Sequence, residues 1–293
     1  MSDTAHYLQT HHQLIEQHLN KLIPEYHNSY QPLFDATRYA LLGGGKRLRP
    51  ILTLATVQML EGNTQAALTP ACILELIHTY SLIHDDLPCM DNDDFRRGKL
   101  TVHKKFSEGL AVLTGDYLLT VAFEILANSP HLSAEKKVKL ISLLSRRIGS
   151  EGMIGGQVMD INLDGKNINL ETLRLLHRNK TGALITTAVE FGGIITDVND
   201  IQFDQLRQFG ENIGLAFQII DDILDVTSSQ IKHGRTVSSD LINKKSTYIT
   251  LLGLEQSQVY AKELFNKAIA ALKMFPHAHL LTKLADFMIH RKY

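Results

Sequence analysis

Acidic side chains crowd into one short stretch of the sequence, directly followed by two arginines. The stretch contains Asp85, Asp86, Asp91, Asp93, Asp94, Arg96 and Arg97. Two like charges about 4 Å apart repel by about 4 kcal/mol at an effective dielectric constant of about 20, so such a cluster needs a cation or full solvation. Carboxylate oxygens are hard ligands that favour Mg²⁺ over Zn²⁺. The stretch therefore predicts a magnesium site.

The chain must bend for these aspartates to share an ion. On one uninterrupted helix, Asp85 and Asp91 would point about 240° apart at about 100° per residue. Pro88 cannot continue the helical hydrogen bonds, and it pushes Leu87 out of helical geometry. We therefore expect a helix to end here and the following loop to bring Asp91 back toward Asp85. The simpler interpretation, a solvated acidic loop, leaves carboxylates opposing a helix dipole.

A second acidic group, Asp221, Asp222 and Asp225, lies in a segment whose neighbours are apolar. No proline interrupts it, so residues 221 and 225 lie about 40° apart on one helical face. Charged groups among apolar neighbours are costly without a partner. Two such groups facing each other across a cavity would suit several Mg²⁺ ions whose shells are completed by substrate phosphates, which indicates diphosphate chemistry.

Basic residues provide candidate ligands for a second anion. Lys46 and Arg49 follow three glycines, at the expected start of a helix, where backbone N–H groups favour anions. Further candidates are Arg96, Arg97, the pair Lys180 and Thr181, and the run from Lys244 to Thr247. Basic pairs are usually solvated, so none of them decides the function alone. His78 also has an ordinary interpretation as a buried, hydrogen-bonded histidine.

The composition fits one globular domain over residues 1–293, with 44% hydrophobic residues and a net charge of −1. The charge excludes a general nucleic-acid-binding field. Two cysteines give no disulfide framework, and no signal peptide or membrane-spanning run is apparent, so we expect a cytoplasmic protein without stable membrane association. Periodicity predicts an all-α bundle with a central cavity. Its expected helices cover residues 4–23, 33–42, 51–60, 70–87, 110–127, 134–150, 170–179, 183–191, 203–227 and 257–274.

Six motifs together resemble one enzyme family. They are Gly44 to Pro50, the first aspartate group with Arg96-Arg97-Gly98, Gly155 to Asp160, Lys180 to Gly182, Phe217-Gln218 with the second aspartate group, and Lys245 to Tyr248. In this order and spacing they are similar to the trans-isoprenyl diphosphate synthases, especially the bacterial farnesyl diphosphate synthases. The resemblance implies the all-α isoprenoid synthase fold, a homodimer, and condensation of isopentenyl diphosphate with dimethylallyl or geranyl diphosphate to (2E,6E)-farnesyl diphosphate.

The resemblance also implies roles for individual residues. Three Mg²⁺ ions, for which Mn²⁺ could substitute, would be ligated by Asp85, Asp91 and Asp225, with Asp86, Asp221 and Asp222 in support. The diphosphate of the allylic substrate falls to Arg96, Lys180 and Lys245. The diphosphate of isopentenyl diphosphate falls to Gly45, Lys46, Arg49, His78 and Arg97. Thr181 and Gln218 would border the reacting carbons. Together with Lys180 and the ligating aspartates Asp85, Asp91 and Asp225, they make up the expected catalytic residues.

Tyr80 is the candidate determinant of product length. An aromatic residue five positions before the first aspartate resembles the enzymes that stop at fifteen carbons, because its ring would floor the pocket into which the product grows. The alternative is an ordinary core tyrosine whose hydroxyl finds a partner. The chain also departs from the family's usual Gly-Lys-x-x-Gly-x-Asp run, since it has Arg235 and Ser238 there, and Ser238 lacks the backbone freedom of glycine.

Other functions use similar residues. A geranylgeranyl or geranyl diphosphate synthase would share every motif and differ in product. A class I terpene cyclase also ionises an allylic diphosphate, but it has no need of the basic set for a second diphosphate. A non-catalytic subunit would not need all six aspartates. A di-metal carboxylate oxidase would need inward Glu-x-x-His pairs, which do not accompany these aspartates.

Overall fold

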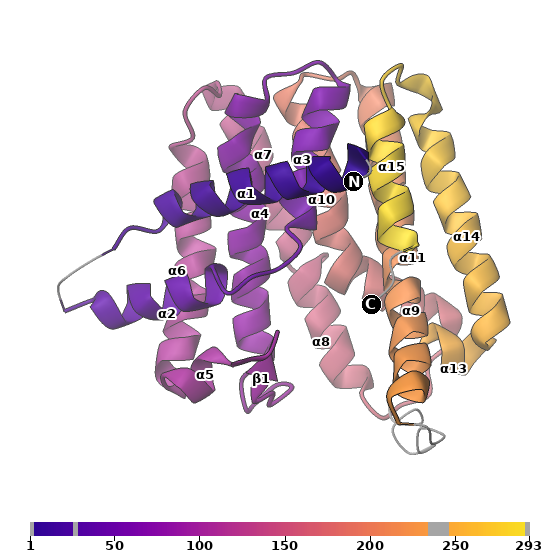
Figure 1. Cartoon of the computed structure of the whole chain (residues 1–293), viewed down its shortest axis with the longest axis horizontal. Coiled ribbons are helices and arrows are strands. Elements are labelled where there is room, and N and C mark those ends of the chain that lie inside the picture. Colours follow the sequence, from indigo (N-terminus) through magenta and orange to yellow (C-terminus); the bar gives the residue numbers. More distant parts are fainter. Residues whose placement is uncertain (1–2, 26–28, 234–245, 291–293) are drawn as a thin grey trace. The chain divides into compact units, whose positions relative to one another are not determined.

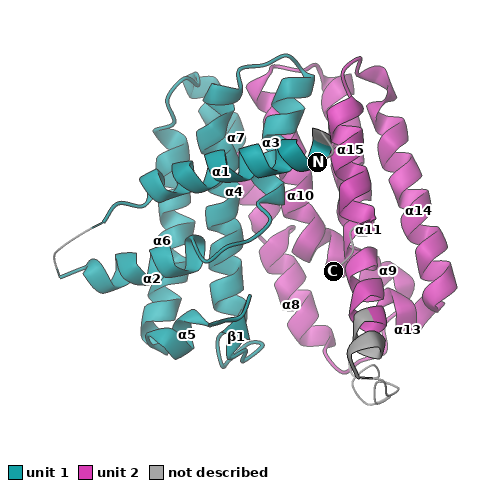
Figure 2. Cartoon of the chain, viewed as in Figure 1, with its two compact units in different colours: residues 1–141 teal, residues 142–293 magenta. Residues whose placement is uncertain are grey.

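The computed structural model describes residues 3–25, 29–233 and 246–290. They form two compact units, residues 1–141 and residues 142–293, which Figure 2 colours teal and magenta. Helices make up almost all of the regular structure in the described residues, which confirms the all-α prediction. The exception is a two-stranded antiparallel hairpin, β1 (Phe95–Arg96) and β2 (Lys99–Leu100), that the sequence pattern did not predict. Each unit is described by itself.

Unit 1 is built around α4, which packs against α1, α2, α3 and α6. Its helices are α1 (Asp3–Leu22), α2 (Gln31–Leu41), α3 (Leu48–Met59), α4 (Thr64–Asp85), α5 (Val102–Lys105) and α6 (Glu108–Ala127), and α7 (Ala134–Ile148) crosses into unit 2. Figure 1 shows them in indigo to pink. The expected boundaries of most of these helices are confirmed to within a few residues.

The main difference in unit 1 concerns the start of α4. The sequence predicted a beginning at Pro70, but the helix begins at Thr64 and contains Pro70 in its interior. The side chain of Asn63 caps the helix by accepting hydrogen bonds from the backbone N–H groups of Gln65 and Ala66, at 2.9 and 3.2 Å. This cap fixes the start two turns before the proline, which lacks a backbone N–H and so interrupts the hydrogen bonds of the helix without ending it.

Helix α6 approaches α4 closely near the acidic stretch. His84 Nε2 lies 3.1 Å from the carbonyl oxygen of Val112. An added Cβ at Gly115 would collide with the imidazole ring of His84, so only a glycine allows the two helices to approach this closely. The position of His84, the residue before Asp85, is therefore fixed by the backbone of α6.

Among the described residues, α4 and α6 are long and apolar enough to cross a membrane, contrary to the expectation that no run would approach this. In α4, 83% of the apolar window is buried, so its composition is that of a core helix. In α6 only 39% of the window is buried, and Val112 and Leu113 are exposed. Length and composition alone are weak evidence for a membrane span.

Unit 2 is built around α11 (Asp200–His233), which packs against α10 and α14. The other helices of this unit are α8 (Met153–Leu163), α9 (Leu170–His177), the π-helical turn η1 (Arg178–Gly182), α10 (Ala183–Ile195), α13 (Tyr248–Leu252), α14 (Leu254–Ala271), the 3₁₀ turn η2 (Leu272–Met274) and α15 (His279–Ile289). Periodicity did not predict α8, α13 and α15. The segment of α8 contains Gly155 and Gly156, which resemble helix breakers.

Candidate functional site

The first candidate segment is residues 43–49, which we call the basic loop. Gly44 and Gly45 have φ angles of 100° and 135°, a conformation that L side chains rarely adopt. Lys46 is exposed in the loop, and Arg49 is half-buried in the first turn of α3. The expectation that both lie on helix positions holds for Arg49 only. The loop thus presents two cations at the start of a helix, which suits an anion.

The second candidate segment is residues 85–97, which we call the acidic loop. The backbone N–H of Asp91 donates to the carbonyl oxygen of Asp85 at 2.9 Å. The carbonyl of Leu87 accepts from Met90 and Asn92, at 2.9 and 3.1 Å, so the chain turns sharply around Pro88. This confirms the prediction that α4 ends here and that the loop returns Asp91 to Asp85. The backbones of Asp85 and Asp91 are therefore in direct contact, although five residues separate them in the sequence.

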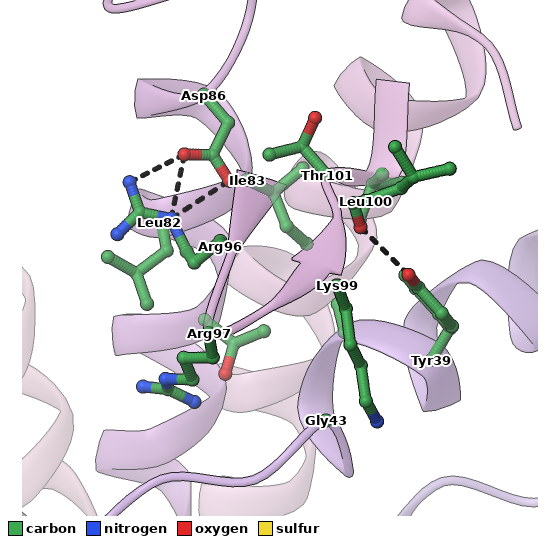
Figure 3. Close-up of a pocket in the computed structure, with 13 residues that line it drawn as sticks. Tyr39, Gly43, Leu82, Ile83, Asp86, Arg96, Arg97, Lys99, Leu100 and Thr101 are labelled. Carbon is green, nitrogen blue, oxygen red and sulfur yellow. Dashed lines mark hydrogen bonds and ion pairs between the residues drawn. The ribbon is translucent and has the colours of Figure 1, made fainter. Parts of the chain in front are cut away.

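Asp86 differs from its neighbours because its carboxylate already has a protein partner. It is buried, and it accepts hydrogen bonds from Arg96 Nε at 2.7 and 3.0 Å, with Arg96 Nη2 2.5 Å from Oδ1 (Figure 3). Burial raises the pKa of Asp86, and the opposing effect of Arg96 is smaller. The pair fixes the direction of Arg96. Asp86 was expected to support a metal, but in this structure its carboxylate is paired with Arg96.

Arg97 connects the two loops of unit 1. Its guanidinium donates to the carbonyl oxygen of Gly44, and a Cβ added at Gly45 would lie 2.7 Å from Arg97 Nη1. Burial and then the charges of Arg49, Arg97, Arg47 and Arg96 lower the pKa of the half-buried His78 well below its ordinary value. His78 is therefore neutral near pH 7, in a region of strong positive potential. Unit 1 thus contains the predicted ligands of one diphosphate, Lys46, Arg49, His78 and Arg97, together with Arg96, one of those predicted for the other.

A pocket with about 470 Å³ of empty space lies beside the Asp86–Arg96 pair (Figure 3). It opens between α2, the end of α4 and the hairpin, and Tyr39 donates to the carbonyl oxygen of Leu100 at its rim, at 2.8 Å. Its lining includes Arg96, Arg97 and Lys99 but neither Asp85 nor Lys46. The pocket is therefore lined by parts of both loops, Gly43 in one and Asp86, Arg96 and Arg97 in the other.

Tyr80 is buried in α4, and its hydroxyl has no hydrogen-bond partner among the described residues. Its ring stands edge-on to His84, with the ring centroids 5.8 Å apart. Burial, and secondly the charge of Asp85, raises the pKa of Tyr80 to about 12. An ordinary core tyrosine would have a partner for its hydroxyl. The hydroxyls of Tyr7, Tyr248 and Tyr260 lack one as well, so the role of the Tyr80 ring stays a prediction.

In unit 2 the second acidic group lies on the uninterrupted helix α11, as predicted. Asp225 is exposed, Asp221 is half-buried and Asp222 is buried. Asp222 accepts hydrogen bonds from Gln218 Nε2 at 3.2 Å and from the backbone N–H of Tyr248 at 3.1 Å. Burial raises the pKa of Asp222 to about 6, and the two hydrogen bonds oppose this only in part. Asp222 thus connects α11 to α13 and orients Gln218.

Lys180 and Thr181 lie in the π-helical turn η1, and both are half-buried. Lys180 Nζ forms an ion pair with Asp160 Oδ2 at 2.5 Å. Gly156 has no room for a Cβ because the backbone of Lys180 lies against it. The motif from Gly155 to Asp160 therefore aims Lys180, a function that its sequence did not reveal.

Among the described residues, no three His, Cys, Asp or Glu side chains converge to hold a metal by themselves. The donor chemistry still fits a hard cation, because oxygen atoms of Asp85 and Asp91 in unit 1, and of Asp221 and Asp225 in unit 2, are presented on neighbouring positions. Lys245, Arg235 and Ser238 lie outside the described residues. The metal and diphosphate ligands therefore stay predictions. Asp86 and Asp222 differ from the other aspartates because they are buried and hydrogen-bonded to the protein.

Helical units that combine aspartate-rich segments with basic loops define a class of proteins that act on diphosphates. Residues 30–281 match the polyprenyl synthetase family, and the chain belongs to this family. It is 48% identical to a farnesyl diphosphate synthase of Micrococcus luteus, over 92% of this chain and 93% of that protein. It is also 46% identical to a chloroplastic geranylgeranyl pyrophosphate synthase of Capsicum annuum, over 88% of this chain and 71% of that protein.

Solved structures agree with this family. An FPP/GFPP synthase from Zymomonas mobilis, in its apo form, superimposes with a TM-score of 0.89. The two chains are 38% identical, and the match covers 98% of this chain and 99% of the other. The resemblance that the six motifs indicated is thereby confirmed.

Proposed function

We propose that this prenyltransferase condenses isopentenyl diphosphate with dimethylallyl diphosphate or geranyl diphosphate and releases farnesyl diphosphate and diphosphate. One observation carries the proposal: Arg97, at the end of the acidic loop, donates to Gly44 in the basic loop. This contact supports the proposal that a purely cationic diphosphate site at the basic loop adjoins metal ligands of the acidic loop. A cyclase, which has one diphosphate substrate, has no use for the second site.

The ligands divide between the two substrates. Lys46, Arg49 and Arg97 supply charge for the diphosphate of isopentenyl diphosphate, and the neutral His78 supplies a hydrogen bond. Arg96, held by Asp86, and Lys180, held by Asp160, contact the allylic diphosphate. Lys245, outside the described residues, belongs to the same group. Each of these cations neutralises charge on an anion that water would otherwise solvate.

Asp85, Asp91, Asp221 and Asp225 would hold Mg²⁺, three ions as the resemblance implies, with Mn²⁺ as a substitute. The bound cations supply charge neutralisation for the departing diphosphate. Asp86 and Asp222 act from behind, because their oxygens accept hydrogen bonds from Arg96 and from Gln218 and Tyr248. In this proposal the first and last aspartates of each group face the ligand, and the middle one accepts hydrogen bonds from neighbouring protein groups.

The protein groups then have clear tasks in the reaction. Arg96 and Lys180 take up negative charge as the allylic C–O bond breaks. Gln218 donates its amide N–H to Asp222, which leaves its carbonyl oxygen as the end that can face the allylic cation. The double bond of isopentenyl diphosphate attacks this cation, and the proton is lost to the departing diphosphate. Holding both substrates in reach replaces any protein nucleophile.

Tyr80 sets the product length in this proposal. Its ring is buried in α4, five residues before Asp85, and stands edge-on to His84. A product tail that grows along α4 away from Asp85 would meet the ring. The relatives do not decide the length, because farnesyl and geranylgeranyl synthases are similarly close.

The working form of the enzyme is proposed to be a soluble, cytoplasmic homodimer. The apolar side of α6, which includes Val112 and Leu113, is the surface in unit 1 that a second copy would cover. Burial of such a patch is a common basis of stable dimers.

The test is incubation of the purified protein with isopentenyl diphosphate, Mg²⁺ and either allylic diphosphate, followed by chain-length analysis of the products. We expect a fifteen-carbon product, no turnover with EDTA, and a longer product from Tyr80→Ala. Tyr39→Ala, which removes a tyrosine ring at the pocket beside the Asp86–Arg96 pair, is the matched control and should leave the length unchanged. A twenty-carbon product from the wild type would support a geranylgeranyl diphosphate synthase instead, and no turnover at all would contradict the proposal.

A further inference from the structure

We propose that Glu16 in α1 and Glu75 in α4 are positioning residues that fix the basic loop through Arg47 and thereby set the affinity for isopentenyl diphosphate. The inference rests on the proposed function, because it concerns the loop assigned to that substrate. Neither glutamate is near the ligand-facing cations in the sequence, and neither belongs to a motif.

Arg47 is the fixed point of the loop. Although it lies between the exposed Lys46 and α3, it is only 2% exposed. Its Nε donates to Glu16 Oε1 at 2.6 Å, its Nη1 to Glu75 Oε2 at 2.8 Å, and its Nη2 to the carbonyl oxygen of Leu41 at 2.6 Å. The guanidinium is thus held on three sides, by α1, α4 and the end of α2.

These contacts maintain a backbone shape that the loop would not adopt alone. Arg47 has a φ angle of 50°, in the left-handed region that is unfavourable for a residue with a side chain. Burial of the guanidinium is a further cost, which its pairs with Glu75 and Glu16 outweigh, so that the pKa of Arg47 is raised. If one carboxylate lost its charge, the ion pairs that stabilise this backbone conformation would be weaker.

The shape decides where the ligand-facing cations point. Because the Arg47 side chain is directed into the unit, Lys46 before it is left on the surface, and α3 begins immediately after it, which places Arg49 in the first turn. The neighbouring residues are also held: His12 Nε2 lies 2.9 Å from the carbonyl oxygen of Gly45, and Arg97 donates to Gly44. Residues 44, 45 and 47 are therefore all anchored, and two of these anchors come from α1.

Helix α1 lies before the part of the chain that matches the polyprenyl synthetase family, residues 30–281. It crosses α3 and α4 in Figure 1 and contacts both. Helix α1, which lies outside the family match, therefore holds the basic loop. Glu16 is partly exposed, so its substitution should disturb the core less than substitution of the buried Glu75.

The test is Glu16→Gln, which keeps the size of the side chain and removes its charge. We expect the KM for isopentenyl diphosphate to rise by about 5- to 20-fold, in line with the loss of one charged hydrogen bond. The KM for geranyl diphosphate and kcat should stay within about twofold. Titration calorimetry with isopentenyl diphosphate alone should show the same loss of affinity, and Glu16→Asp, which keeps the charge, should recover part of it.

Glu25→Gln is the matched control, because Glu25 also pairs with an arginine of unit 1, Arg38, at 3.2 Å, but does not touch the basic loop. It should leave both KM values unchanged. The inference is overturned if the wild type turns over and Glu16→Gln leaves the KM for isopentenyl diphosphate unchanged, or raises both KM values equally together with a lower Tm. A wild type that neither binds isopentenyl diphosphate nor turns over contradicts the proposed function itself.

Discussion

The acidic groups of the two units both consist of two adjacent aspartates and a third further along, but they are anchored by different chemistry. In each, the middle aspartate is buried and occupied by the protein, while the last is exposed. Asp86 in unit 1 is held by the guanidinium of Arg96, and Asp222 in unit 2 is held by the neutral N–H groups of Gln218 and Tyr248. The anchor of unit 1 is thus an ion pair, and that of unit 2 is a pair of dipoles.

The second of two adjacent aspartates can therefore serve two different supporting tasks. Asp86 places a cation, Arg96, that can itself contact an anionic ligand. Asp222 places a neutral amide, Gln218, and anchors the backbone at Tyr248, so it adds no positive charge to its unit. The outward aspartates should therefore be equivalent in the reaction, whereas the middle ones should fail in different ways when they are changed.

The largest expected effect comes from the outward aspartates. We expect Asp85→Ala and Asp225→Ala each to lower kcat/KM by about 100-fold or more, because each removes charge stabilisation from the departing diphosphate. Steady-state turnover of geranyl diphosphate at saturating Mg²⁺ measures this, with circular dichroism to check the fold. A loss below tenfold in either variant would contradict the equivalence of the two groups.

Asp86→Asn should have the next largest effect. It leaves Arg96 without a charged partner, so the free energy of unfolding should fall by about 1.5 to 3 kcal/mol, and the KM for geranyl diphosphate should rise about tenfold. Urea unfolding and steady-state kinetics measure the two quantities. Asp93→Asn is the control, because exposed Asp93 lies 3.5 Å from the same arginine. Equal effects of both variants would show that the buried pair has no special importance.

Asp222→Asn should reveal the neutral anchor through pH. The pKa of Asp222 is about 6 in the folded protein against about 3.9 for an unperturbed aspartate, so the folded form binds the extra proton. Stability should therefore fall as pH rises from about 4 to about 6, by at most about 3 kcal/mol. The Asn variant should lack this slope in thermal unfolding with EDTA, while Asp204→Asn on the same helix keeps it. An unchanged slope would contradict the assignment.

The sequence predicted the helices with strong periodicity and the return of the chain at Pro88, because both follow from local rules. It also identified both acidic groups and the basic loop. It could not distinguish Asp85 from Asp86, since which of two adjacent carboxylates turns inward depends on Arg96, ten residues further along and brought back by a hairpin. The pattern allows both choices.

Other parts of the site depended on contacts that no spacing shows. Asp160 and Lys180 were recognised as parts of separate motifs, but their ion pair depends on the close approach of α8 to η1 at Gly156. The anchors of Arg47 come from Glu16 and Glu75, which are 31 and 28 residues away. Long-range pairs of this kind follow from packing, and the packing has to be known first.

The close contact between Gly115 and His84 gives α6 a second significance. The imidazole fills the space that any larger residue at position 115 would need, and the next residue of α4 is Asp85. A residue larger than glycine at position 115 would therefore displace the ring that adjoins the first aspartate. Val112, which is exposed on the proposed dimer surface, is also the residue whose carbonyl oxygen lies 3.1 Å from His84 Nε2.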